Sequence, residues 1–443
     1  MIVIDIPVVL ASANRQEPGH VGAPSKPKIR LEIARSMSIK KHVFIALSAF
    51  MFAFFFAQAM SVSLLAIWLK NNLHLSGTQI GMVFSANFMA SLCSQPLYGF
   101  ISDKVGLNKT LMWCIATMVL CCGFFFTLIY KPLLLLNPLT GAIIGGIYIG
   151  VTFNAGAYAI EAYADRAGRK HGFEYARVRA YGSLGFAVAA LFSGTLFNID
   201  PRIDFFLATA AGLVMLPILM MTPLRACPDD ATAAKSLRLR DALDVLNRKD
   251  FWRFMVLILG VTSLYWVYDL QFPAYFASQF ATTQQGTAMF GYLNSAQIFV
   301  EAGMFYLAPV IVNRIGAKNG LLLAGAIMIA RIAGSGLVTG PLLISCMKMM
   351  HALELPILFT AIFRYIAQNF ESRLSSTIYL VGSGFIRNIG ITVLSYAAGL
   401  GYDALGFPVT YLVIAALAAI FWLVSVFALS PSPANTNAPQ VPA

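Results

Sequence analysis

Val43 to Leu69 reads VFIALSAFMFAFFFAQAMSVSLLAIWL, an apolar stretch without a charged side chain. It is longer than the roughly 20 apolar residues that a helix needs to cross the ~30 Å hydrocarbon core of a bilayer. Eleven further stretches share this character, and short, mostly polar linkers separate them. They lie near residues 79–102, 110–130, 137–163, 176–198, 203–223, 252–278, 287–311, 319–338, 341–366, 375–400 and 407–430.

These stretches decide the fold class. Within lipid, backbone polar groups must be paired inside the spanning structure, which only α-helices and closed barrels achieve. The apolar runs are too long and too uniform for barrel strands, which alternate polar and apolar residues. The sequence therefore predicts an all-α membrane protein with 12 transmembrane helices.

The composition supports the same class. Of the 443 residues, 58% are hydrophobic and 11% are charged, whereas soluble domains carry about 25% charged residues. This excludes a soluble, disordered or fibrous chain. The net charge of +12 could indicate a nucleic-acid partner, but such binders gather Lys and Arg on a folded polar surface. Basic loops of a membrane protein explain the charge better, so no nucleic-acid partner is expected.

The distribution of Lys and Arg predicts the orientation. Twenty-four of the 31 lie in the N-terminal stretch, in the loops from even to odd spans and in the central loop. The opposite loops hold only Lys70, Lys131 and Arg202, and four more cations lie within spans. Because short loops rich in Lys and Arg stay in the cytoplasm, both termini are expected to be cytoplasmic.

Two loops indicate an internal repeat. DKVGLNK (Asp103–Lys109) follows the second span, and NRIGAKN (Asn313–Asn319) follows the eighth. A Gly turn with basic residues is common in cytoplasmic loops, but the equivalent positions favour two parallel six-helix repeats, with a substrate site between them at mid-membrane. The expected parts are a flexible extension (1–36), a six-helix bundle (37–223), a cytoplasmic loop (224–251), a second six-helix bundle (252–430) and a flexible tail (431–443).

Nine ionisable side chains lie inside the predicted spans, where such groups are costly and usually face a partner or a water-filled cavity. A buried ion pair can simply fix helix packing, but nine groups are a high load for packing alone. Four acids balance four cations, which indicates mutual pairing. The set comprises Glu161, Asp269, Glu301 and Glu354, with Arg179, Arg331, Lys348, Arg387 and His351.

The tenth span carries a polar stripe. Lys348, His351 and Glu354 recur every three residues, so a continuous helix places them within one arc of about 120°. A buried Glu holds a proton near neutral pH unless a cation offsets its burial, and His titrates in the same range. The stripe therefore has the chemistry of a proton relay.

In the N-terminal half, Glu161 and Arg179 lie toward the cytoplasmic ends of adjacent spans. An Arg beside a carboxylate suits bidentate hydrogen bonding to neighbouring hydroxyls. Phe186 follows Arg179 by seven residues and Asn154 precedes Glu161 by seven, so each shares a helical face with its charged neighbour. Core packing is the ordinary role of a lone Phe, but an aromatic face beside these groups also suits the apolar face of a sugar ring.

The eighth span adds Asn294, Gln297 and Glu301, whose spacing places them on one face that should line a cavity. No pair of carboxylates is recognisable as that of a glycosidase, and no nucleotide-binding loop appears. The six cysteines have no metal-ligand spacing. We therefore expect neither an enzyme nor a metal or cofactor site.

These residues resemble the oligosaccharide/H⁺ symporter family of the major facilitator superfamily, from about Met37 to Leu429. The resemblance is strongest in KMMHALELP (Lys348–Pro356) and FESRLSSTIYL (Phe370–Leu380), and clear in GFISDKVGLNK (Gly99–Lys109) and FEYARVR (Phe173–Arg179). It implies two six-helix bundles and a functional monomer. The loop motif of the superfamily corresponds to Gly99, Asp103, Lys104, Gly106 and Lys109.

The resemblance also implies roles for the buried polar residues. Glu354 would carry the proton, tuned by Arg331, His351 and Tyr265, and Asp269 would pair with Lys348. Glu161 and Arg179 would bind sugar hydroxyls, with Asn154 and His351 completing the contacts. Phe186 occupies the position where the lactose permease stacks a Trp against galactose.

Departures from the lactose permease bear on the sugar. Its essential eighth-helix acid falls on Ile298 here, and the helix instead resembles that of the sucrose permease, so Glu301 would replace that acid. An Asp–Lys pair between the seventh and eleventh helices is replaced by Trp266 and Arg387. Arg387 would then stack on Trp266, at roughly 0.5–2 kcal/mol, or reach the substrate.

The sequence thus predicts proton-coupled import of a disaccharide or related oligosaccharide by alternating access. Sucrose-like sugars come first and galactosides second. The expected location is a bacterial-type inner membrane, with the sugar, the proton and the lipid bilayer as partners. An H⁺-coupled exporter of sugars or drugs on the same fold remains the alternative.

Overall fold

The computed structural model describes residues 26–105, 109–222, 245–370 and 378–430, and these are helical with short connections and no strand. The first half contains α1 (Lys26–Val62), α2 (Leu65–Ile67), η1 (Trp68–Asn72), α3 (Gly77–Val105), α4 (Thr110–Leu120), α5 (Cys122–Phe124), η2 (Phe125–Tyr130), α6 (Lys131–Leu136), α7 (Pro138–Ile149), η3 (Gly150–Ala155), α8 (Gly156–His171), α9 (Tyr175–Ile199) and α10 (Pro201–Met221). The second half contains α12 (Lys249–Leu257), η5 (Ile258–Thr262), α13 (Ser263–Ser278), α14 (Thr283–Ile315), α15 (Ala317–Leu337), α16 (Pro341–Met349), α17 (His351–Asn369), η7 (Tyr379–Ile386) and α19 (Arg387–Ala428).

The predicted spans all coincide with helical stretches, but the count of 12 is not confirmed. Nine helices among the described residues are long and apolar enough to cross a membrane, or ten if Thr110–Leu120 and Cys122–Leu136, bent by 45°, form one span. The helix α3 is not among the nine, since Gln, Asn and Ser side chains interrupt its apolar sequence. The helix α19 contains the second half of the predicted span 375–400 and most of the span 407–430, and Gly406 breaks it with a φ of 77°.

The boundaries of the predicted parts are only partly described. Residues 26–36, expected in a flexible extension, belong to α1, and residues 249–251, expected in the cytoplasmic loop, begin α12. Residues 1–25, 223–244 and 431–443 lie outside the described residues. The expectations for these segments therefore stay predictions.

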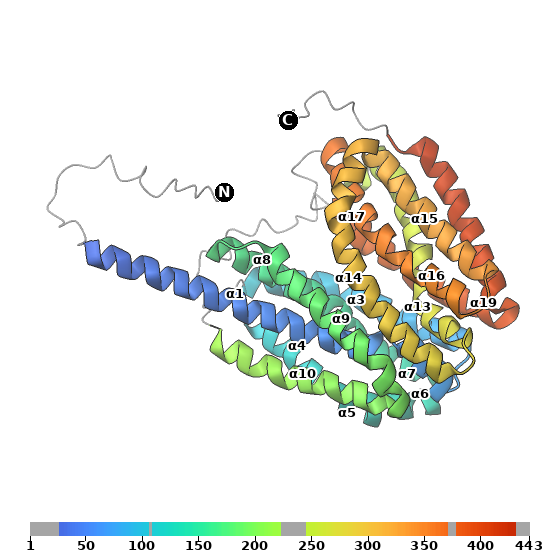
Figure 1. Ribbon diagram of the computed structural model, residues 1–443, viewed down its shortest axis with the longest axis horizontal. Helices are drawn as coiled ribbons and strands as arrows, with labels where there is room; N and C mark the ends of the chain where they lie inside the picture. Colours follow the sequence, from blue (N-terminus) through green and yellow to red (C-terminus); the bar gives the residue numbers. More distant parts are fainter. Residues whose placement is uncertain (1–25, 106–108, 223–244, 371–377, 431–443) are drawn as a thin grey trace.

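The two halves form separate bundles, coloured blue to green and yellow to red in Figure 1. They contact each other mainly through α3 with α19 and through α9 with α14. Glycines permit this close approach: a Cβ on Gly81 would lie 2.4 Å from the Ser395 carbonyl oxygen, and one on Gly194 would lie 2.4 Å from that of Thr287. Substituting either would force the bundles apart.

Polar contacts reinforce this junction at one end of the bundles. The Asp403 carboxylate accepts hydrogen bonds from the backbone nitrogens of Gly77 and Thr78, at 2.6 and 2.7 Å. It thereby caps the first turn of α3, where free backbone N–H groups favour an anion. The Asn198 amide donates to the Gln284 carbonyl at 2.8 Å. The bundles are therefore tied together where α3 and α14 begin.

The repeat expected from the two Gly-containing loops is visible in a matched pair of contacts. Lys109 Nζ donates to the carbonyls of Leu219 and Thr222 at the end of α10, at 2.7 and 2.8 Å. Lys318 Nζ donates to the Leu429 carbonyl at the end of α19, at 2.8 Å. A cation at the carbonyl end of a helix is favourable because it meets the negative pole of the helix dipole. Each loop thus clamps the last helix of its own bundle.

The rest of the loop motif is less fully described. Gly99 lies in α3 in open space, with nothing near a Cβ built on it. Asp103 and Lys104 belong to α3, but their side chains lie outside what the structure describes, as does all of Gly106.

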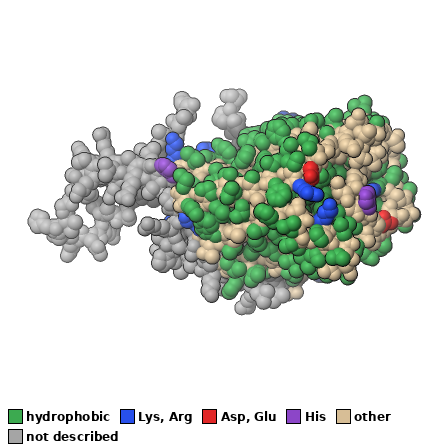
Figure 2. All heavy atoms as spheres, turned by 90° about the horizontal axis from the view of Figure 1, so that it is seen from below, with side chains coloured by type: hydrophobic (Ala, Val, Ile, Leu, Met, Phe, Trp, Pro, Cys, Tyr) green, Lys and Arg blue, Asp and Glu red, His purple; other side chains and the backbone are tan. Residues whose placement is uncertain are grey.

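The outer surface suits lipid. The face seen in Figure 2 is largely hydrophobic, with few charged side chains. Large apolar side chains such as Leu136, Tyr306 and Phe427 are more than 80% exposed. Soluble monomers rarely expose contiguous apolar patches of this extent, so the chain is a multi-pass membrane protein.

Asp204, in the first turn of α10, is fully buried, and neither of its carboxylate oxygens has a hydrogen-bond partner among the described residues. Burying an ionised carboxylate without a partner costs more than burying a neutral amide of the same shape. We expect Asp204→Asn to raise the apparent melting temperature of the purified protein, by the equivalent of roughly 1 kcal/mol.

Asp200 provides the matched control, because its carboxylate caps the same helix and accepts a hydrogen bond from the Arg202 backbone nitrogen at 2.8 Å. Asp200→Ala should lower the melting temperature, by the equivalent of about 1 kcal/mol. A fall in melting temperature with Asp204→Asn would show that this carboxylate has a stabilising partner.

Candidate functional site

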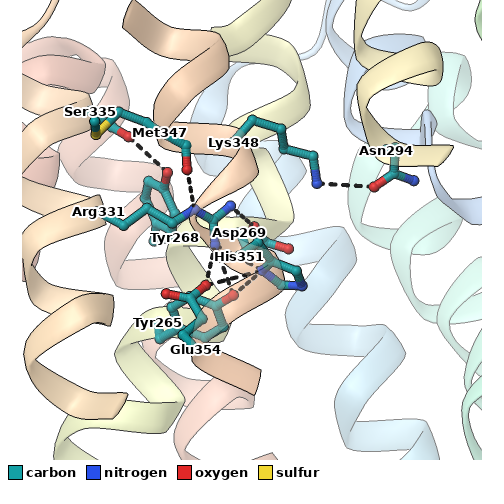
Figure 3. A network of polar contacts seen from close by, with 10 residues as sticks. All are labelled: Tyr265, Tyr268, Asp269, Asn294, Arg331, Ser335, Met347, Lys348, His351 and Glu354. Carbon is teal, nitrogen blue, oxygen red and sulfur yellow. Dashed lines mark hydrogen bonds and ion pairs between the residues drawn. The ribbon is translucent and has the colours of Figure 1, made fainter. Parts of the chain in front are cut away.

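Arg331 is the centre of a buried ionic cluster in the second bundle (Figure 3). The helix α15 holds this side chain at 0% exposure. Its Nη2 donates to Asp269 Oδ1 on α13 at 2.7 Å, and its Nη1 donates to Glu354 Oε1 on α17 at 2.8 Å. One guanidinium thus bridges two carboxylates from two other helices.

Tyr265 and His351 complete the cluster. Arg331 Nη1 donates to the Tyr265 hydroxyl at 2.7 Å and lies 2.9 Å from His351 Nδ1. The same His351 nitrogen contacts the Tyr265 hydroxyl and lies 3.2 Å from Glu354 Oε1. The sequence-predicted proton residues Glu354, Arg331, His351 and Tyr265 therefore share one contact network.

The second oxygen of Glu354 is different. The side chain is fully buried, and its Oε2 has no hydrogen-bond partner among the described residues. Buried polar atoms are almost always paired, so this oxygen is an exception within the cluster. Protonation there would weaken the ion pair that Oε1 forms with Arg331.

Three aromatic rings surround Arg331, and two of them, Tyr268 and Phe272, were not predicted from the sequence. Its guanidinium carbon lies 5.4, 5.1 and 5.4 Å from the ring centroids of Tyr265, Tyr268 and Phe272. The Tyr268 hydroxyl contacts Ser335 Oγ at 2.8 Å. Tyr268 and Phe272 are three and seven residues after Tyr265, which places them on the same face of α13. This spacing in the sequence could have identified both residues as neighbours of Tyr265.

The partner of Lys348 differs from the expectation. Among the described residues, its Nζ donates to Asn294 Oδ1 at 2.9 Å, and Asp269 pairs with Arg331 instead. The tenth span is interrupted at Met350, between α16 and α17. Met350 keeps helical backbone angles, with φ of −58° and ψ of −24°, so the three residues of the stripe stay close, but the Lys348 side chain reaches α14 instead of Asp269. It still lies within electrostatic range of Asp269.

In the first bundle, Glu161 on α8 and Arg179 on α9 form an ion pair, with Oε1 and Nε 2.7 Å apart. The side chains are 27% and 33% exposed, so both remain accessible to a polar ligand. Arg179 also donates to Ser183 Oγ at 3.2 Å and stacks over Phe55, 4.1 Å from its centroid. Phe55 comes from α1, and no spacing in the sequence links it to this pair.

Glu301 connects the two bundles electrostatically. It lies on α14, hydrogen-bonded to the amide of Gln297, and is within electrostatic range of His351, Lys348 and Arg179. The first two belong to the second bundle and Arg179 to the first. The acid therefore lies between the ionic cluster and the Glu161–Arg179 pair.

The other predicted sugar contacts are half-buried or buried. Asn154 lies in η3 and is half-buried, and Phe186 is partly buried against the core on α9. Asn294 and Gln297 are buried, and Gln297 Oε1 has no partner among the described residues. The π-helical turns η3 and η7 adjoin Asn154 and Arg387, and such turns occur often at functional sites.

Arg387 has the neighbour expected of it and one that was missed. Its guanidinium carbon lies 5.5 Å from the Trp266 ring centroid. Its Nη2 also donates to the Tyr158 hydroxyl on α8, at 3.1 Å. Tyr158 belongs to the first bundle, so this hydrogen bond joins the two halves. Tyr158 precedes Glu161 by three residues, which places them on one face of α8.

The chain matches the family described as LacY proton/sugar symporter over residues 36–441. It belongs to the LacY proton/sugar symporter family. The relatives of this symporter are permeases and transporters, so it is a transport protein and not an enzyme, as the sequence predicted.

Several permeases are similar to this LacY-family chain over most of their length. The raffinose permease of Escherichia coli is 40% identical over 390 residues, covering 87% of this chain and 92% of the relative. The lactose permease of Citrobacter freundii is 40% identical over 374 residues, covering 83% and 90%. The sucrose permease of Escherichia coli is 36% identical over 384 residues, covering 86% and 92%.

Solved structures show that the symporter shares the major facilitator fold. The nucleoside transporter NupG superposes with a TM-score of 0.75 at 14% identity, covering 88% of this chain and 100% of that one. At this identity the likeness concerns the fold alone. The predicted architecture is confirmed, apart from the exact number of spans.

The site of this symporter has the chemistry for a proton and a polyhydroxyl ligand. No cluster of His, Cys, Asp or Glu suited to a metal ion occurs in the described part of the chain. The ionic cluster around Arg331 brings Glu354, Asp269, His351 and Tyr265 together in a buried place. The partly exposed Glu161–Arg179 pair offers charged hydrogen-bonding groups to hydroxyls.

Proposed function

We propose that this chain imports a disaccharide or related oligosaccharide together with a proton, by alternating access. The single observation that carries the proposal is the buried Glu354, which is held by Arg331 through one oxygen while the other has no partner in the described part of the chain. A carboxyl in this state can alternate between protonated and ion-paired forms. The proton would be the only coupling ion, without a metal or cofactor.

Glu354 would be the proton carrier, and Arg331 would set when the proton leaves. When Glu354 is protonated, Arg331 keeps Asp269 as its remaining ionised partner. When the proton leaves, the Arg331–Glu354 ion pair re-forms and compensates the buried negative charge. His351 and Tyr265, in contact with both groups, would relay the proton.

Glu161 and Arg179 would bind the sugar, because they are the partly exposed charged pair of the first bundle. Glu301, Lys348 and Asn294 would hold the side of the sugar toward the second bundle. A sugar bound across both bundles would bring its hydroxyls within reach of Glu301, which lies within electrostatic range of His351. Sugar binding and proton binding could thus influence each other over a short path.

The arrangement of the bundles fits an import cycle. If the loops rich in Lys and Arg are cytoplasmic, both termini lie inside and the Asp403 contacts with α3 lie on the outer side. The described state would then be closed to the outside. In this proposal, the chain works as a functional monomer in a bacterial inner membrane.

Sucrose-like sugars are the first choice of substrate and galactosides the second. Identity does not separate the two, because the relatives named for raffinose and lactose are both 40% identical to this chain and the one named for sucrose is 36% identical. Ile298 occupies the place of the acid that the lactose permease requires, and Glu301 follows one turn later. These features favour sucrose over lactose.

A panel of sugars tests this choice. In weakly buffered proteoliposome suspensions, adding sucrose or raffinose is expected to alkalinise the medium, because each sugar molecule enters with a proton. Lactose, melibiose and maltose should give smaller signals, and a protonophore should abolish all of them. Alkalinisation by lactose but not by sucrose would overturn the sucrose preference.

The same vesicles distinguish import from export. With the outside made acidic, labelled sugar is expected to accumulate inside above its external concentration. An H⁺-coupled exporter oriented as predicted would not concentrate the sugar under this gradient.

A further inference from the structure

An apolar groove runs along the outer face of the first bundle. Its volume is about 540 Å³, and it lies between α1, α9 and α10. Alanines make room for it: Ala49 and Ala53 line it from α1, and Ala210 and Ala211 line it from α10. The groove is separate from the polar site, since Phe55, which contacts Arg179, is not among its lining residues.

The groove has the length of one lipid leaflet. Its lining on α1 extends from Phe44 to Phe56, a rise of about 18 Å along a helix. The hydrocarbon core of a whole bilayer is ~30 Å thick. An extended hydrocarbon chain lying along α1 would therefore fill the groove from the membrane surface to the midplane.

Positive charge lies at one mouth of the groove. Lys40 and Lys41 are exposed and precede Phe44 by one turn. Tyr181, a groove residue on α9, follows Arg177 by four residues and so shares its face. Arg177 is 73% exposed and forms a hydrogen-bonded ion pair with the exposed Glu174, at 3.2 Å, so the excess charge comes from Lys40 and Lys41. The local charge at the mouth is positive.

One polar atom of the groove also lacks a partner. Ser48 lines the groove, is 4% exposed, and its hydroxyl has no hydrogen-bond partner among the described residues. Buried hydroxyl groups are usually hydrogen-bonded, so the packing of these helices alone does not explain the Ser48 hydroxyl.

We propose that this groove binds an anionic phospholipid, with an acyl chain along α1 and the phosphate held by Lys40 and Lys41. A lipid chain matches the apolar lining, and a phosphate matches the cationic mouth. A second copy of this chain fits less well, because two such mouths would repel each other. A zwitterionic lipid would leave the positive charge unmatched.

Native mass spectrometry of the purified full-length protein tests the proposal. The probes are phosphatidylglycerol and phosphatidylcholine with identical acyl chains, added in detergent. We expect wild type to retain phosphatidylglycerol roughly 30-fold more strongly, as two lysines near an anionic headgroup imply. The double variant Lys40→Gln/Lys41→Gln should retain the two lipids equally, whereas Lys131→Gln should behave like wild type.

A second variant tests the groove itself. Ala210→Phe places a ring in the groove and is expected to remove retention of phosphatidylglycerol. Equal retention of both lipids by wild type would overturn the proposal, as would unchanged retention in the double lysine variant. Because Lys40 and Lys41 are exposed, the lysine variant remains a valid test if Ala210→Phe does not fold.

Discussion

Replacing Glu354 by Gln is expected to abolish uphill sugar accumulation while leaving exchange of sugar across the membrane intact. Gln cannot lose a proton, so the Arg331 ion pair cannot re-form and the proton gradient can no longer drive transport. Exchange requires only that the loaded carrier reorients, and a neutral residue mimics the protonated state. Oε2 of Glu354 has no partner within the ranges that the structure describes, and this makes the side chain the expected carrier.

Two measurements in the same proteoliposomes separate the steps. Under an imposed proton gradient, sugar should equilibrate across the membrane without being concentrated, while exchange of labelled for unlabelled sugar should proceed at the wild-type rate. Asp250→Asn is the matched control, because Asp250 pairs with Arg253 at 2.8 Å in an exposed position on α12. Normal accumulation by Glu354→Gln would show that another group carries the proton.

The sequence predicted the fold class and the family, both of which are confirmed. Long apolar stretches without charged residues predict membrane-spanning helices, because lipid offers no hydrogen-bond partner to the backbone and a helix pairs its own backbone groups. Lys109 and Lys318 lie in the two Gly-containing loops that occupy equivalent places in the two halves of the sequence. Each lysine donates to a carbonyl oxygen at the end of the last helix of its own bundle. The spacing indicated the repeat, whereas the contacts of the two lysines with the helix ends are visible only in the structure.

Contacts between helices were harder to predict. The spacing of Lys348, His351 and Glu354 predicts that they share one region of a helix, but it does not predict which side chain on a neighbouring helix each one meets. Lys348 bonds Asn294, and Asp269 pairs with Arg331. Balanced charges predict that pairs form, but only the packing of helices decides which acid meets which cation.

Contacts between bundles had almost no sequence signal. Tyr158 and Arg387 are 229 residues apart and meet across the two halves. Their hydrogen bond depends on how far one bundle is tilted against the other. That tilt follows from packing at Gly81 and Gly194, remote from both residues in sequence.

Replacing Glu161 by Gln is expected to remove sugar binding itself, and with it both accumulation and exchange. The amide keeps the shape of the side chain but loses the charge that strengthens hydrogen bonds to hydroxyls and orients Arg179. Hydrogen bonds to charged groups are worth about 1.5–3 kcal/mol, so the dissociation constant should rise roughly 100-fold. Isothermal titration of the purified protein with the preferred sugar measures this loss directly.

Glu174→Gln supplies the control, because Glu174 pairs with Arg177 only one turn from Arg179 but is 74% exposed. This variant should bind sugar as wild type does, since solvent screens an exposed ion pair. Both variants should retain the wild-type melting temperature. Loss of accumulation with unchanged sugar affinity in Glu161→Gln would instead place Glu161 in the proton pathway, because a substrate-binding acid must affect binding before it affects coupling.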